Sequence, residues 1–251
     1  MIKQKILADA FPVLLGVWLV FVVSAAIADT QASAPNGDCV VLLHGLIRTS
    51  ASMEKMQKAL DADGYKVINK SYPSRDFPIE ELAPMAVEAG IEGCGELQEN
   101  GQVHFVTHSL GGILVRYYFE DNDLAHLGRV VMLAPPNQGS EAADDLRGLP
   151  GFEMLNGPAG NQLGKGEESI PLQLGTPDFE FAVIAGDRSI DPITSAVLPN
   201  PDDGKVSVSD TRLEGMSDFA LVSVSHAYIM KNDDVIEMVK RFLRTGQLKE
   251  D

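Results

Sequence analysis

Residues 103–112 read VHFVTHSLGG and decide the fold. The apolar and β-branched residues 103–107 favour a buried strand, and residues 113–120 have an amphipathic, helical pattern. Ser109 lies at the turn between the two. A serine on so sharp a strand-to-helix turn has a strained backbone and needs very small neighbours. The stretch therefore predicts a nucleophilic serine, Ser109, at the carboxyl end of a strand.

The neighbours of Ser109 match the nucleophile-elbow pattern G-x-S-x-G in part. Gly111 fills the second glycine position, whereas Thr107 replaces the first glycine and weakens the match. The alternative is a serine that caps an ordinary helix. A cap requires neither His108 before the serine nor two glycines after it, so we favour the elbow.

Similar strand and helix patterns alternate on both sides of this stretch, which predicts an α/β fold with a mostly parallel sheet and helices on both faces. Strands are expected at residues 39–43, 65–72, 103–107, 129–134, 179–185 and 220–224, and helices at 53–62, 79–92, 113–120 and 233–245.

Residues 137–178 contain many Gly, Pro and Asn residues and are expected to be irregular. A connection of this length inside a domain is often a lid. Its apolar residues Phe152, Met154, Leu155 and Leu163 would suit a cap over an acyl pocket. The alternative is a solvent loop with a few anchoring residues.

A serine hydroxyl needs a base and a group that orients the base. On this fold the chain order is Ser, then Asp or Glu, then His. His226 follows the last expected strand and is the predicted base, because His126 comes too early for an acid to precede it. His104 and His108 are interpreted as packing or hydrogen-bonding residues.

The acid is left open by residue chemistry. Asp187 follows the strand at 179–185, and Asp203 lies in a turn that reads PDDGKV. Asp191 and Asp202 could also serve. Each has the alternative of being a turn-forming aspartate.

The oxyanion of the intermediate needs two backbone N–H donors. The residue after the nucleophile, Leu110, supplies one. The loop after the first strand should supply the other, and Leu46 follows the His44–Gly45 pair there. The alternative for Gly45 is an ordinary turn glycine.

Composition excludes several classes of function. The 251 residues include 20 Lys and Arg against 36 Asp and Glu, a formal charge of −16. Such a chain is poorly suited to bind nucleic acid or an anionic membrane surface. Two cysteines are too few for a multi-disulfide scaffold. No H-E-x-x-H or clustered Cys/His pattern predicts a metal, and no cofactor is expected.

The first 28 residues are typical of a secretory signal peptide. Lys3 and Lys5 precede the uncharged stretch 11–28, which ends in the A-x-A pattern of residues 26–28. The stretch is also near the minimum length of a membrane span, so an uncleaved anchor is the alternative. Either outcome places the domain at residues 29–251 outside the cytoplasm, periplasmic or secreted. Membrane association would follow only from an uncleaved segment.

VVLLHGL, YPSR, VHFVTHSLGGILVR, DDGKVSV and VSHAYIM together resemble the α/β-hydrolase superfamily, and more narrowly bacterial esterases and lipases of the class 2 lipase and GPI inositol-deacylase-like group. The resemblance covers most of residues 39–243 and matches 137–178 only loosely. It implies a nucleophile, base, acid and two oxyanion donors at Ser109, His226, Asp203, Leu46 and Leu110. Ala227 and Tyr228 after the histidine do not support the structural calcium of some related lipases.

The resemblance also places Cys39 and Cys94 at neighbouring strands. In this fold both would lie at the amino end of the sheet, so a disulfide is expected, with two buried free thiols as the alternative.

The function implied by the family is hydrolysis of a small-molecule or lipid ester through an acyl-enzyme. The triad alone would also serve an acyltransferase or an amide or thioester hydrolase. A non-catalytic binding protein of the same fold is the other class of alternative, and it would have no use for the triad.

Overall fold

The computed structural model describes residues 37–145 and 152–250, and for residues 152–155 it describes the backbone alone. The predicted signal segment 1–28 lies outside the described residues. The described residues belong to one compact unit.

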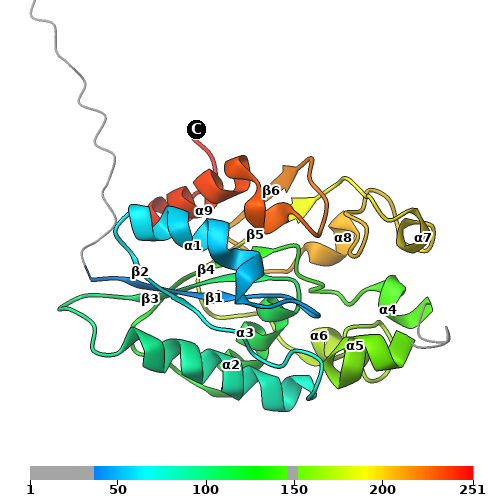
Figure 1. The fold of residues 1–251 in the computed structure, drawn as a ribbon, viewed down its shortest axis with the longest axis horizontal. Helices are drawn as coiled ribbons and strands as arrows, with labels where there is room; N and C mark the ends of the chain where they lie inside the picture. The colour runs from blue at the N-terminus through cyan, green and yellow to red at the C-terminus, as the bar shows by residue number, and fades with distance from the viewer. Residues whose placement is uncertain (1–36, 146–151, 251) are drawn as a thin grey trace, which may run out of the picture. The chain divides into compact units, whose positions relative to one another are not determined.

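A six-stranded parallel sheet forms the centre of this unit, with the strand order β2-β1-β3-β4-β5-β6 (Figure 1). Because all the strands run the same way, their carboxyl ends meet at one edge, where ligand sites of such sheets lie. The strands are β1 Cys39–Leu43, β2 Lys66–Asn69, β3 Val103–His108, β4 Leu127–Leu133, β5 Phe181–Gly186 and β6 Asp218–Val222.

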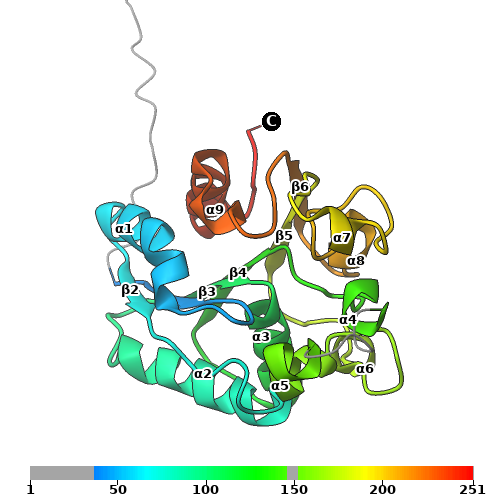
Figure 2. The same cartoon turned by 45° about the vertical axis from the view of Figure 1, so that its right-hand side comes forward.

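Helices cover both faces of the sheet (Figures 1 and 2). One face packs against α2 Ile79–Cys94 and α3 Leu110–Asp121, and the other against α1 Glu54–Ala62 and α9 Asp233–Thr245. The short 3-10 helices Ser50–Met53 and Ile229–Lys231 flank α1 and α9. The α/β fold expected from the sequence is confirmed.

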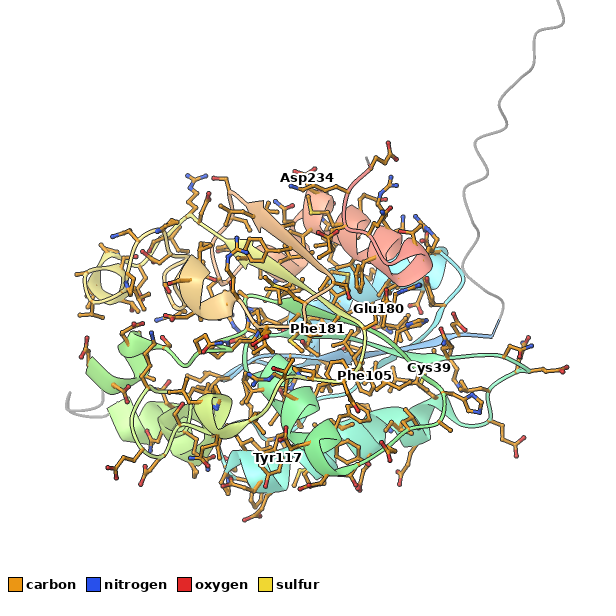
Figure 3. All side chains as sticks on the ribbon, turned by 180° about the vertical axis from the view of Figure 1, so that it is seen from behind. Cys39, Phe105, Tyr117, Glu180, Phe181 and Asp234 are labelled. Atoms are coloured by element: carbon orange, nitrogen blue, oxygen red, sulfur yellow. A yellow bond between two sulfur atoms is a disulfide. The ribbon has the colours of Figure 1, made fainter. Side chains whose placement is uncertain are left out.

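Strands β1 and β5 are apolar throughout because both of their faces are buried. In β1, Cys39, Val41 and Leu43 face the α2–α3 layer, while Val40 and Leu42 face the α1–α9 layer. Phe105 of β3 and Phe181 of β5 are fully buried in the core on the α2–α3 side, near the centre of the sheet (Figure 3).

The segment 137–178 differs from the irregular structure expected. Its described part contains the short helices α4 Glu141–Asp145, α5 Phe152–Asn161 and α6 Ile170–Gln173. Helices this short have too few turns for a periodic pattern, and tertiary contacts stabilise them. Leu163 is buried against the core, whereas the side chains of Phe152, Met154 and Leu155 lie outside the described set, so a cap role stays a prediction.

The buried guanidinium of Arg116 in α3 holds this segment. It donates to the backbone carbonyls of Asn137, Pro171, Leu174 and Gly175 and to the Asn137 side chain, at 3.1–3.4 Å. Burial lowers the pKa of Arg116 to about 10. A single helix residue thus ties together both ends of the segment 137–175.

Several elements differ from their expected bounds: α3 and β4 begin three and two residues before their expected starts, β5 begins two residues after, and β6 begins and ends two residues early. The strand expected at 65–72 ends at Asn69, where its pairing with β1 ends, because β2 is an edge strand with one partner. Two short helices, α7 Pro192–Ser195 and α8 Val208–Thr211, lie between β5 and β6 and have no counterpart among the predicted elements.

Cys39 and Cys94 form a disulfide in the structure, which joins the start of β1 to the end of α2. Cys39 lies at the opposite end of β1 from the loops that follow the strands (Figure 3). The pairing is the one expected from the family resemblance.

No helix in the described ranges 37–145 and 152–250 is both long enough and apolar enough to cross a membrane.

Candidate active site

Ser109 occupies the sharp turn between β3 and α3. Its backbone has φ 52° and ψ −119°, an unfavourable conformation for a residue with a side chain. Its N–H donates to the Leu133 carbonyl at 2.9 Å, which holds the turn against β4. The strained backbone and the abrupt start of α3 at Leu110 are the local structure expected of a nucleophile elbow.

Gly111 is required by the close approach of β1. A Cβ atom at this position would lie 2.7 Å from the Leu43 carbonyl oxygen and 3.1 Å from the His44 carbonyl oxygen. Backbone atoms cannot move aside as a flexible side chain can. The glycine therefore lets the first turn of α3 lie directly against the end of β1.

Thr107 stands where the elbow pattern has a glycine, and Gly112 provides the room for it. A Cβ atom on Gly112 would lie 3.3 Å from the Thr107 hydroxyl oxygen. Thr107 is fully buried, and its hydroxyl donates to the Val131 carbonyl at 3.4 Å. The second glycine of the pair thus accommodates the departure from the pattern.

His226 lies just past β6 and pairs with Asp203. Its Nδ1 donates to Asp203 Oδ2 at 2.8 Å, and its backbone N–H donates to the Asp203 carbonyl at 3.0 Å. In a neutral imidazole with a proton on Nδ1, Nε2 has the free lone pair. The ring is therefore oriented to accept a proton at Nε2.

The Asp203 carboxylate is 1% exposed and accepts three hydrogen bonds. Oδ1 accepts the backbone N–H groups of Lys205 at 3.0 Å and Val206 at 2.9 Å. Oδ2 accepts from His226. Three donors on one carboxylate fix its rotamer.

The other aspartates that the sequence left open take different partners. Asp187 is half-buried just past β5, and its backbone N–H donates to the Val222 carbonyl. Asp191 pairs with Thr194 and Lys205, whose hydrogen bonds lower the pKa of its carboxyl well below the usual value. Asp202 accepts from Ser195 and Gly204. The structure therefore pairs His226 with Asp203.

His108, the residue before Ser109, is buried against His226, with the two ring centroids 4.7 Å apart. Its Nε2 donates to the backbone carbonyl of His226 at 3.0 Å. Burial, with smaller effects from His226 and Arg48, holds the pKa of His108 well below its ordinary value. The neutral ring links the serine turn to the loop of the base.

The loop that follows β1 lies against the same turn. A Cβ atom on Gly45 would be 2.7 Å from His108 Nδ1 and 3.2 Å from Ser109 Cβ, so only glycine allows this approach. Among the described residues, the backbone amides of Leu46 and Leu110 have no hydrogen-bond acceptor. Two unpaired donors beside the serine suit an oxyanion.

Sequence reasoning missed three contacts near this site. The ring of His44 stacks on Tyr72, with centroids 4.0 Å apart and an angle of 8°. Tyr72 N–H donates to His44 Nε2 at 3.2 Å, and the Tyr72 hydroxyl donates to the His44 carbonyl. The available signal was that His44 directly follows β1 and that Tyr72 is the first residue of the YPSR motif.

In the described ranges no group of three His, Cys, Asp or Glu side chains is arranged to hold a metal ion. The site is built from a serine, an imidazole, a carboxylate and backbone amides.

Solved structures of bacterial lipases and esterases share this arrangement of sheet and helices. Lipase BlEst2 of Bacillus licheniformis, in its mature form, aligns with a TM-score of 0.69 and 19% identity, over 85% of this chain and 95% of that chain. An extracellular α/β-hydrolase from a Paenibacillus species aligns at 0.53 and 14% identity, over 83% and 99%. The chain has an α/β-hydrolase fold.

Phospholipase PlaB of Legionella pneumophila aligns with a TM-score of 0.66 and 18% identity, over 84% of this chain and 60% of that chain. At such identities the α/β-hydrolase likeness establishes the fold and leaves the activity open. No protein-family model matches the chain. No curated protein matches it either.

Proposed function

We propose that this α/β-hydrolase-fold protein is a serine carboxylic-ester hydrolase, of the carboxylesterase or triacylglycerol-lipase kind. The observation that carries the proposal is the buried Asp203–His226 hydrogen bond of 2.8 Å. It holds an imidazole with a basic Nε2 in the loop that packs against the turn of Ser109. A binding protein would gain nothing from a strained serine, an oriented base and two free amides in one place.

The reaction proceeds through an acyl-enzyme. Ser109 Oγ attacks the carbonyl carbon of the ester while His226 Nε2 takes the hydroxyl proton. The Leu46 and Leu110 N–H groups bind the oxyanion of the tetrahedral intermediate, and the imidazolium is stabilised by Asp203. His226 then returns the proton to the departing alcohol. Water, activated by the same base, releases the carboxylic acid and restores Ser109.

Ester substrates are favoured over amides by likeness to proteins described as lipases, a phospholipase and a carboxyl esterase. The substrate is therefore a small-molecule or lipid ester, with no cofactor and no nucleic acid involved. The triad itself does not distinguish an ester from an amide or thioester, or water from another acyl acceptor.

The test uses a matched pair of aspartates. Asp203→Asn should lower kcat for p-nitrophenyl butyrate by about 10³–10⁴-fold, because the amide stabilises the wrong tautomer of His226. Asp187→Asn should remain within about threefold of the parent protein. Equal activity in both variants, or a larger loss in Asp187→Asn, would overturn Asp203 as the acid. An inactive parent that transfers no acyl group would contradict the hydrolase proposal.

We also propose that the protein acts outside the cytoplasm. The charged start, apolar stretch and A-x-A pattern of residues 1–28 support export, and a Cys39–Cys94 disulfide suits an oxidising compartment. N-terminal sequencing of the exported protein should begin near Asp29, whereas an uncleaved N-terminus in a membrane fraction would support the anchor. Two free thiols by intact mass without reductant would contradict the disulfide.

A further inference from the structure

The Leu46 amide is aimed by the peptide unit to which it belongs. The Gly45 carbonyl and the Leu46 N–H are parts of one planar, trans peptide and point in opposite directions. Whatever fixes the Gly45 carbonyl therefore fixes the direction of the Leu46 N–H. The Gly45 carbonyl accepts two hydrogen bonds, from His44 Nδ1 at 2.9 Å and from the Arg48 N–H at 3.3 Å.

The His44 ring is held in one tautomer by its partners. A carbonyl can only accept, so Nδ1 carries the proton that is donated to Gly45. Nε2 then has the lone pair, and it accepts the Tyr72 N–H. The fully buried ring has both nitrogens paired.

Tyr72 holds His44 through three contacts. Its ring stacks on the imidazole, its N–H donates to Nε2, and its hydroxyl donates to the His44 carbonyl. Burial raises the pKa of the Tyr72 hydroxyl far above its ordinary value, so the hydroxyl stays a donor. Tyr72 comes from the chain after β2, so the clamp joins two loops at the carboxyl edge of the sheet.

We propose that His44 and Tyr72 are positioning residues of the oxyanion hole: His44 Nδ1 holds the Gly45 carbonyl and so aims the Leu46 N–H at the substrate oxyanion, and Tyr72 holds His44. The inference rests on the proposed function, because it assigns Leu46 as an oxyanion donor. Neither side chain touches the substrate in this account. Substitution of either residue should therefore weaken binding of the transition state, which lowers kcat, and should leave ground-state binding of the substrate nearly unchanged.

Substitution of His44 by asparagine or by glutamine tests the roles of its two ring nitrogens separately. The Asn side-chain nitrogen lies as many bonds from Cα as His Nδ1, so His44→Asn keeps a donor for Gly45. His44→Gln places its polar atoms one bond further, near the position of Nε2, and lacks the donor at the Nδ1 position. His44→Ala removes both.

We expect His44→Ala and His44→Gln to lower kcat for p-nitrophenyl butyrate by about tenfold to a hundredfold with KM within threefold, less than the roughly 10²–10³-fold that removal of a whole donor costs. His44→Asn should recover most of this loss. Tyr72→Phe should lower kcat by several-fold, because the backbone N–H and the stacking remain. Affinity for a trifluoromethyl ketone, which forms a tetrahedral adduct, should fall in parallel with kcat/KM.

His104→Ala is the matched control. His104 is another buried imidazole that accepts a backbone N–H, from Arg129 at 2.8 Å, but it lies in β3 beside Asp38, at the far end of the sheet from Ser109. The control should lose stability without a specific loss of kcat at a temperature where it is folded. Wild-type kcat in folded His44→Ala, or equal loss in His44→Ala and His44→Asn, would overturn the proposal.

A second readout separates this proposal from the proposed function. In protein labelled with [¹⁵N]leucine, the Leu46 amide signal can be assigned by its absence in Leu46→Met. Its chemical shift should move in His44→Ala and stay near its parent position in His44→Asn, whether or not the protein hydrolyses esters. An unchanged shift in His44→Ala would refute the clamp, whereas a shifted signal in a protein without esterase activity would refute only the function.

Discussion

His108 Nε2 donates to the backbone carbonyl of His226 at 3.0 Å, so the residue before the proposed nucleophile holds the backbone of the proposed base. The two residues are 118 positions apart in sequence. The bond joins the carboxyl ends of β3 and β6, which β4 and β5 separate in the sheet order. The spacing between the serine turn and the histidine loop is thus fixed by a buried side chain, as well as by the sheet.

Loss of the His108–His226 hydrogen bond should leave the backbone of His226 less firmly held. His108→Leu, which keeps much of the volume but has no donor, is expected to lower kcat by about tenfold and to destabilise the fold by about 1–3 kcal/mol, because a buried carbonyl loses its partner. His108→Gln retains a donor near the position of Nε2 and should keep more of both. Steady-state kinetics and urea unfolding of the two variants measure this. Equal kcat in parent protein and His108→Leu would contradict it.

Acid should destabilise the protein through its buried histidines. Burial lowers the pKa values of His44, His104 and His108 in the fold. Above about pH 6.5 these rings are neutral in the folded and in the unfolded protein. Below about pH 6.5 the unfolded chain binds protons that the folded chain does not. The free energy of unfolding should therefore fall on acidification, by up to about 1.4 kcal/mol per pH unit for each ring.

Urea unfolding at pH 7.5, 6.5 and 5.5 measures this slope. His104→Gln should reduce the slope by removing one ring, and His126→Gln, which replaces an exposed imidazole, should leave it unchanged. A midpoint that stays constant between pH 7.5 and 5.5 would show that the three rings do not stay neutral in the fold.

The two glycines after Ser109 should differ in tolerance. Gly111→Ala places a Cβ atom 2.7 Å from a backbone oxygen, whereas Gly112→Ala meets the Pro135 side chain and the Thr107 hydroxyl at 3.3 Å. We expect a loss of about 2–3 kcal/mol in stability for the first and of about 1 kcal/mol or less for the second. Urea midpoints compare them, and equal losses would refute the distinction.

Arg116 should stabilise the segment 137–175. Arg116→Met leaves the carbonyls of Asn137, Pro171, Leu174 and Gly175 without this donor, and we expect a loss of about 2–4 kcal/mol. Hydrogen exchange of the α6 amides should be faster in Arg116→Met than in the parent protein. Arg241→Met, at an exposed pair with Glu250, is the control and should change stability by less than about 0.5 kcal/mol. Unchanged exchange in α6 would contradict the anchoring role.

Residue patterns were sufficient for the central part of the fold. β1 is apolar throughout and β3 is rich in apolar and β-branched residues, and both strands are fully buried, so their residue patterns placed them within a residue of their observed ends. The helices of 137–178 could not be predicted in this way, because α4 and α6 have only five and four residues and depend on tertiary contacts such as those of Arg116.

The acid that pairs with His226 could not be chosen from the sequence, for a different physical reason. Asp187 follows a strand and Asp203 lies in a turn, and both positions suit a turn-forming aspartate as well as a catalytic one, so residue chemistry could not rank them. Only the return of the chain from β6 brings His226 onto the Asp203 carboxylate. The His44–Tyr72 contact is equally long-range, since its partners are 28 residues apart and meet where two loops leave the sheet.

The central claim is that Ser109 is a nucleophile activated by His226. The most direct measurement is labelling of the purified protein with a fluorophosphonate, with the modified residue located by peptide mass spectrometry. The account predicts a single adduct on Ser109 that is lost in His226→Ala. Adduct formation on another serine, or no labelling of the folded protein with or without detergent, would contradict it.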